Sequence, residues 1–492
     1  MKNIFAGSWP LHIFAFLLIP LSCWQVWVFP SIPNYYAQHF LLYPCLVFML
    51  WAWKKGLWTP PEAWRLARPF LPWLIALFAV QTLADWRSAR LFLPEDAPLG
   101  RAVLFDLIRL GAQLPFALFF ALLCRVALRE EKSRRCLLRG AIWAFGLLAF
   151  WCAVQAVYIY TTPSENWTYL CDQQIEHPVA RATAGRLLFL FSPLLEARWE
   201  NAFYDFYSQG AYALTLPRFN GFFEEASALA AMVGVFFAPL AFGLLGLSSR
   251  RNFRLAGGVM LLCCFVILLF CRSRTGWLLA LAGLLLILWA ILRRQWGARA
   301  ALMAAGLMLV CLWAALLAGQ SQPEFRQRLA KMGKLPRMVC LLDTVDMIKA
   351  HPLLGVGRNW YFAHLHNGER YLAHLSNPEL RFWKEQGSGG ELSALPALAA
   401  QYGLPLTLLA LGFVGRVCWR LRRMRRARPD SALLAFMVPA SVAWLVLGLT
   451  VSLGSVDIRN PLFCLPFFCF YAVSQGVGLE ESLEGGATCR AA

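Results

Sequence analysis

Stretches of roughly twenty predominantly apolar residues recur along the chain, and no other feature limits its fold as strongly. A helix needs roughly 20 such residues to cross a bilayer, where every backbone polar group must be satisfied within the segment. Hydropathy predicts about twelve such spans, and the composition agrees, with 59% hydrophobic and 15% charged residues. The spans are predicted at 12–29, 36–53, 69–85, 103–125, 138–161, 226–247, 255–271, 275–292, 300–319, 393–415, 432–453 and 461–478. The fold class is therefore predicted to be all-α, a polytopic integral membrane protein with a single membrane domain over residues 1–492.

The basic residues predict the orientation of these spans. A net charge of +19 suggests a nucleic-acid partner, but the Lys and Arg residues gather in alternate loops, after spans two, four, six, eight and ten. The positive-inside rule assigns such loops to the cytoplasm, together with both termini. The strongest cluster is the arginine-rich stretch 416–428. The basic excess therefore indicates membrane topology, and no nucleic-acid partner is expected.

The same rule predicts two long loops, 162–225 and 320–392, on the opposite, outer side of the membrane. Loops longer than about 15 residues are usually functional or disordered. Both loops contain many aromatic and apolar residues, which predicts that they are folded. We therefore expect the functional site on the outer face.

The second outer loop contains a polar segment, 337–357, punctuated by Pro and Gly. The spacing of Asp343, Met347 and Ile348 predicts a short amphipathic helix, and Pro352 then predicts an extended turn. The two glycines of the following Leu-Gly-Val-Gly allow positive φ or a close approach to another surface. Such a segment in a membrane protein indicates either a structured loop or a site.

Several arginines are predicted near this outer face. Arg218 lies where the first outer loop re-enters the membrane, and Arg272 and Arg274 lie in a short turn between two spans. Arg337 and Arg358 flank the punctuated segment. Ion pairing or lipid headgroups would explain them, but charges at membrane depth are costly and indicate function. Because the guanidinium fork suits phosphate oxygens, these residues predict a site for a lipid pyrophosphate.

The sequence offers little support for a metal or a nucleotide. His364, His366 and His374 share one loop, but their spacing matches no known metal site. No Walker-type phosphate loop is present in the sequence. We therefore expect no cofactor and no metal.

Four sequence pieces together resemble a known family. They are Arg-Phe-Asn-Gly-Phe-Phe-Glu-Glu from Arg218, Ser273-Arg-Thr-Gly, the segment 337–357 with His-Pro-Leu-Leu-Gly-Val-Gly, and Ala400-Gln-Tyr-Gly-Leu-Pro405. In this order the pieces resemble the O-antigen ligase and O-antigen polymerase superfamily of bacterial surface-polysaccharide glycosyltransferases. The resemblance covers roughly residues 210–480.

The resemblance implies a metal-independent glycosyltransferase of the bacterial inner membrane. The donor would be an undecaprenyl-diphosphate-linked oligosaccharide, and the acceptor either lipid A-core (ligase) or a second lipid-linked glycan (polymerase), with membrane lipids around both. Arginines would hold the diphosphate and stabilise it as a leaving group. Arg218, Arg274 and Arg337 match family positions, whereas Arg272 and Arg358 are added from their chemistry.

One departure from the family pattern bears on the branch and on the base. Ligases carry His-Asn about eleven residues before the Gly-Leu that opens the next span, but counting back from Gly403 reaches Leu392, next to Glu391. The pair His366-Asn367 occurs out of register. Either His366 or Glu391 can accept the proton of the attacking hydroxyl. The missing in-register His favours a polymerase, with a ligase as the alternative and a lipid-linked glycan transporter as a weaker one.

Overall fold

The computed structural model describes eighteen helical elements and no β-strand within the residues that it places. The described residues are 50, 52–54, 56, 58–94, 98–111, 114–161, 226–247, 251–271, 273, 275–292, 336–385, 394–451 and 461–479. The predicted spans 12–29 and 300–319, almost all of 36–53 and the predicted outer loop 162–225 lie outside them.

The elements in chain order have the following bounds. They are α5 Pro60–Ala67, the 3-10 turn η1 Arg68–Phe70, α6 Leu71–Phe92, α7 Leu99–Gly111, α8 Leu114–Arg129, α9 Glu131–Thr161, α13 Ala226–Met232, the π turn η4 Val233–Phe237, α14 Ala238–Gly246, α15 Arg251–Phe270, an unlabelled helix Thr275–Leu292, α18 Pro336–Ala350, α19 Tyr361–His366, α20 Glu369–Ala373, α21 Pro378–Glu385, α22 Ala394–Ala427, α23 Ala432–Val451 and α24 Pro461–Ser474.

Six helices in the described part are long and apolar enough to cross a membrane, which agrees with the predicted integral membrane protein. They coincide with the predicted spans 138–161, 226–247, 255–271, 275–292, 393–415 and 432–453. A seventh candidate is the bent pair α5 and α6, with 58° between its halves. The span predicted at 103–125 falls on two helices, α7 and α8, and α24 is shorter than a full span. The count of about twelve spans stays a prediction.

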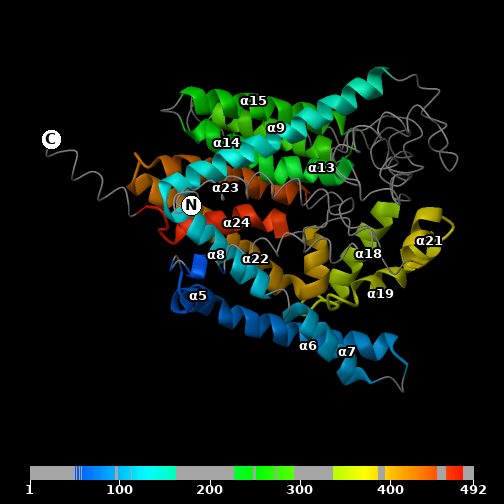
Figure 1. Cartoon of the computed structure of the whole chain (residues 1–492). Helices are drawn as coiled ribbons and strands as arrows, with labels where there is room; N and C mark the ends of the chain where they lie inside the picture. Colours follow the sequence, from blue (N-terminus) through cyan, green and yellow to red (C-terminus); the bar gives the residue numbers. More distant parts are fainter. Residues whose placement is uncertain are drawn as a thin grey trace, which may run out of the picture.

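The helix through α13, η4 and α14 is the most buried of these candidates, with 72% of its apolar window buried. It packs on α15 and α23 (Figure 1). Small residues allow this approach, since a Cβ at Gly246 would lie 2.2 Å from Ala435 O. The π turn ends just before Pro239, whose missing N–H cannot bond Val235 O.

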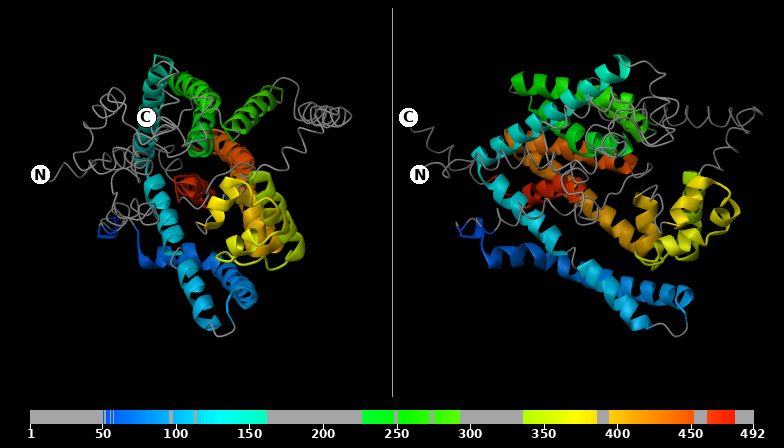
Figure 2. Two further views of the ribbon diagram at one scale, coloured as in Figure 1. Left: turned by 90° about the vertical axis from the view of Figure 1, so that its right-hand side faces the viewer. Right: turned by 45° about the vertical axis from the view of Figure 1, so that its right-hand side comes forward.

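The two ends of the bundle are formed by different elements (Figures 1 and 2). At one end, Arg134 Nη1 donates to Gly478 O (3.2 Å), and Arg428 Nη1 donates to Leu479 O (3.2 Å). These hydrogen bonds connect loops that the charge pattern assigns to the same side of the membrane. The opposite end holds α18 to α21, next to the C-terminal end of α6 and the first turns of α22.

Candidate functional site

The centre of the candidate site is the segment His351–Gly357, referred to below as the 351–357 segment. Its backbone N–H groups bond to α22: Val356 N–H donates to Ala400 O (2.7 Å) and Gly357 N–H to Gln401 O (3.1 Å). In return, Leu404 N–H donates to Pro352 O (2.7 Å). Three backbone bonds therefore fix this segment to the beginning of α22.

A break in α22 makes these bonds available. Gly403 has non-helical angles (φ 81°, ψ 161°), and Pro405 follows it. In a regular helix Gln401 O would accept the N–H of residue 405, but proline has none. Ala400 O likewise loses the N–H of Leu404, which bonds Pro352 O instead. The sequence Ala-Gln-Tyr-Gly-Leu-Pro therefore creates the two free carbonyls that the 351–357 segment occupies.

The carbonyl groups of the segment bond to α6. Ser88 Oγ donates to Val356 O (2.5 Å), and the guanidinium of Arg87 donates to Gly355 O. Ser88 is fully buried and Arg87 is half-buried. The segment thus uses its N–H groups for α22 and its carbonyls for α6, so it joins two helices far apart in sequence.

Two glycines permit this close packing, as the sequence predicts. Gly355 and Gly357 have φ of +69° and +87°. A Cβ at Gly355 would lie 2.5 Å from the backbone of Gln401, and one at Gly357 would lie 2.3 Å from Asp85 Oδ1. Any larger residue would meet both an unfavourable φ and a steric clash. The predicted turn at Pro352 is also present.

Two histidines complete the contact with α6. His364 Nε2 lies 3.0 Å from Ser88 Oγ, whose single proton goes to Val356 O. His364 therefore carries its proton on Nε2 and leaves Nδ1 as an acceptor. Burial, and then the nearby His351 and Arg87, lower the pKa of His364 to about 4. Burial and Arg87 also lower the pKa of His351. Both rings are thus neutral near pH 7.

Buried polar groups concentrate at this junction. Gln81 and Asp85 are at most 1% exposed, and Gln81 Nε2 donates to Asp85 Oδ1 (2.6 Å). Among the described residues, buried atoms that lack a hydrogen-bond partner include Gln81 Oε1, Arg87 Nε and Trp360 Nε1. Buried groups of this kind are rare and indicate an ordered water, an ion or a functional role. The junction therefore resembles a site more than a simple loop anchor.

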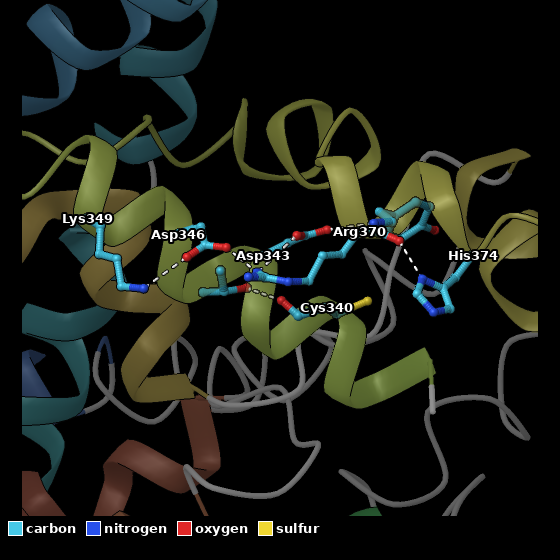
Figure 3. Close-up of polar contacts among 8 residues, drawn as sticks. Cys340, Asp343, Asp346, Lys349, Arg370 and His374 are labelled. Atoms are coloured by element: carbon cyan, nitrogen blue, oxygen red, sulfur yellow. Dashed lines mark hydrogen bonds and ion pairs between the residues drawn. The ribbon is translucent and has the colours of Figure 1, made fainter. Parts of the chain in front are cut away.

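A second set of polar contacts joins α18 to α20 (Figure 3). Asp343 of α18 is 5% exposed and accepts Tyr371 N–H of α20 (2.8 Å). Arg370 lies 3.7 Å from Asp343 and also pairs with Asp346. Burial raises the pKa of Asp343, while the Tyr371 N–H and Arg370 oppose this rise. Met347 is buried on the same helix, so the helix predicted from Asp343, Met347 and Ile348 is present. It is not amphipathic as predicted, because the polar Asp343 is buried as well.

The described structure contains three of the seven predicted site residues. Arg337 is exposed in the first turn of α18, and Arg358 is half-exposed directly after the 351–357 segment. His366 is 7% exposed, with its ring 6.1 Å from that of Phe362 and 5.1 Å from that of Tyr371. The other four residues lie outside the described part: Arg218, Arg272, Arg274 and Glu391. Ser273, next to two of them in sequence, is described, and its Oγ accepts the N–H of Gly276 (2.9 Å).

Sequence reasoning missed the α6 residues, above all Arg87 and Ser88. The predicted span ended at residue 85, but α6 continues to Phe92. The signal was the polar run Asp85-Trp-Arg-Ser within this helical extension. Of the predicted histidines, His374 Nδ1 lies 2.8 Å from Arg370 O. No group of three or more His, Cys, Asp or Glu residues suited to a metal occurs in the described ranges.

Comparison with known proteins covers two of the four quoted motifs, Ser273-Arg-Thr-Gly and the segment 337–357. The family model Wzy_C, described as O-antigen ligase, matches residues 259–381, which include α18 to α20 and the 351–357 segment. No curated protein matches the chain. The family contains membrane glycosyltransferases of the ligase and polymerase type, whose substrates are in general lipid-linked glycans and lipid A-core. Residues 259–381, which are only part of the chain, are therefore similar to the O-antigen ligase family, in agreement with the superfamily that the sequence resembles.

Proposed function

We propose that this protein is a metal-independent polymerase of bacterial surface polysaccharide. It transfers a glycan from undecaprenyl diphosphate to a second lipid-linked glycan at the periplasmic face of the inner membrane. The observation that carries the proposal is the matched segment itself, held by its backbone between α6 and α22. It lies at the end of the bundle opposite the arginine-rich end of α22, which the charge pattern assigns to the cytoplasm.

The diphosphate is bound by arginines in this proposal. Arg218, Arg274 and Arg337 take the family positions, and Arg272 and Arg358 add donors. A bidentate guanidinium contact cannot be replaced by an ammonium group, which lacks the planar fork. Arg218→Lys and Arg274→Lys variants are therefore expected to lose glycan assembly at normal protein levels. Full assembly by both variants would show that the diphosphate role is wrong.

The base is His366 or Glu391. His366 lies on α19 and is buried, with the rings of Phe362 and Tyr371 beside its own. General-base catalysis is typically worth about 10²–10⁴ in rate. We expect His366→Ala to lose this factor in polymer formation from purified lipid-linked repeat. Full activity of His366→Ala beside an inactive Glu391→Ala would assign the base to Glu391. Full activity of both alanine variants would show that neither residue is the base and that the arginines alone carry catalysis.

The pattern of glycan attached to the lipid A-core in a deletion strain distinguishes a polymerase from a ligase. A polymerase deletion leaves one repeat on the core and removes the ladder. A ligase deletion removes all glycan from the core. The ligase remains the second candidate because the family model that matches is described as O-antigen ligase. A deletion strain with unlinked glycan would establish it.

A further inference from the structure

An apolar groove lies at the end of the bundle opposite the 351–357 segment. Its volume is about 460 Å³, and it lies between α8, α9, α14, α23 and α24. Its wall is mostly aliphatic and aromatic, with Ala127, Leu138, Phe236, Met437 and Phe470 among the lining residues. The volume is in the range of small-molecule sites. Because the wall is apolar, water is a poor occupant.

The charged residues that line the groove include two of each sign. Arg134 and Arg135 lie in the first turns of α9 with Glu131, and Asp430 lies in the turn between α22 and α23. Carbonyl groups fix the guanidinium of Arg134, which donates to Leu128 O at 2.9 Å. Arg135 pairs with Glu131 on the surface. Three of the charged groups lie in the first turns of α9 and the fourth lies in the turn before α23, so the groove is polar where these two helices begin.

This arrangement matches the two parts of a membrane lipid. An acyl chain suits the apolar wall, and a guanidinium suits the phosphate oxygens of a headgroup. The balanced charges favour a zwitterionic headgroup over an anionic one. We propose that the groove binds one zwitterionic phospholipid, with the phosphate at Arg134 and Arg135 and the ammonium at Glu131 and Asp430.

The lipid site is separate from the proposed catalytic end. The continuous helix from Leu404 to Ala427 lies between the two regions and is about 35 Å long at 1.5 Å per residue. The lipid fills a space that would otherwise be a cavity among five helices, and cavities destabilise a packed core. Its binding therefore does not depend on the glycan chemistry, and the two proposals are tested apart.

Native mass spectrometry of the detergent-extracted full chain tests the site. We expect the wild-type protein to retain one phosphatidylethanolamine. Ala141 lines the groove from α9 and is half-buried, so Ala141→Trp fills the space and is expected to reduce bound lipid at least tenfold. Ala153 is exposed on the same helix and does not line the groove, so Ala153→Trp serves as the matched control and is expected to keep the lipid.

Rebinding identifies the headgroup. Delipidated protein is mixed with vesicles of phosphatidylethanolamine or phosphatidylglycerol, and Arg135→Gln is compared with wild type. The proposal expects preference for phosphatidylethanolamine and at least threefold weaker binding by Arg135→Gln. A wild-type protein without lipid, equal lipid on Ala141→Trp, or a preference for phosphatidylglycerol would overturn it. If Ala141→Trp does not fold, Leu138→Phe takes its place, because Leu138 lines the same wall and is only half-buried.

Discussion

Protonation of His364 is expected to loosen the contact between α19 and α6. The neutral ring donates from Nε2 to Ser88 Oγ and lies in an edge contact 4.7 Å from Phe92. A proton on Nδ1 would place a second cation beside Arg87 and close to His351, in a partly desolvated place. Lowering the pH therefore acts directly on the junction that holds the 351–357 segment.

The size and sign of the effect follow from linkage. Folding lowers the pKa of His364 from 6.5 to about 4, so the locally opened state binds more protons between these values. The contribution of His364 to the stability of the closed junction is therefore constant above about pH 6.5. It falls as the pH decreases toward 4. From about pH 7.5 to about pH 5 the undiscounted loss is about 2 kcal/mol. Because the ring is partly exposed, solvent screening reduces this to about 1 kcal/mol, or about fivefold in local opening.

Amide hydrogen exchange of the peptides over 351–366 measures this opening. Wild type is compared with His364→Gln at each pH, so the intrinsic exchange rate cancels. We expect wild type to lose about five times more protection than the variant between the two pH values. His374→Gln is a control because the His374 imidazole lies against Arg370 O of α20, and this variant is expected to behave as wild type. Equal loss of protection in wild type and His364→Gln would refute the reasoning.

Three further predictions concern the packing. Gly357→Ala is expected to destabilise the protein by more than about 2 kcal/mol, measured by thermal unfolding, because it combines positive φ with the Asp85 clash; an unchanged midpoint would contradict the close approach. Ser88→Ala leaves a buried carbonyl without its donor and is expected to cost about 1–3 kcal/mol, whereas neutrality would show that water replaces it. The thiols of Cys124 in α8 and Cys469 in α24 lie 3.5 Å apart. A mild oxidant is therefore expected to form a disulfide between the two helices, which peptide mass spectrometry detects. Absence of the cross-link would contradict this helix pairing.

The sequence predicts the parts of the site that depend on local chemistry. The helix over Asp343, Met347 and Ile348 follows from helical spacing, and the turn at Pro352 follows from a missing N–H. The positive φ of Gly355 and Gly357 follows from the Leu-Gly-Val-Gly pattern. These features depend only on neighbouring residues. The structure confirms each of them.

The partners of these features depend on contacts distant in sequence, which no pattern contains. Ser88 and Val356 are 268 positions apart, so nothing in either sequence neighbourhood indicates the other. The burial of His366 has a similar cause. Its residue type suggests a base, but the packing of α19 against Tyr371 of α20 buries its ring. Local rules therefore predict the elements, and tertiary packing decides which side chains are accessible.

Replacing Pro405 tests whether the break in α22 allows the backbone hydrogen bonds to the 351–357 segment. Replacing a proline inside a helix normally stabilises it by about 3 kcal/mol, because a helical hydrogen bond is restored. Here Pro405→Ala would restore an N–H that competes with Gly357 N–H for Gln401 O. We expect little gain in thermal stability and faster amide exchange at Gly357, since the segment loses one of its three bonds to α22. A large gain in stability with unchanged exchange would show that the broken helix does not hold the segment.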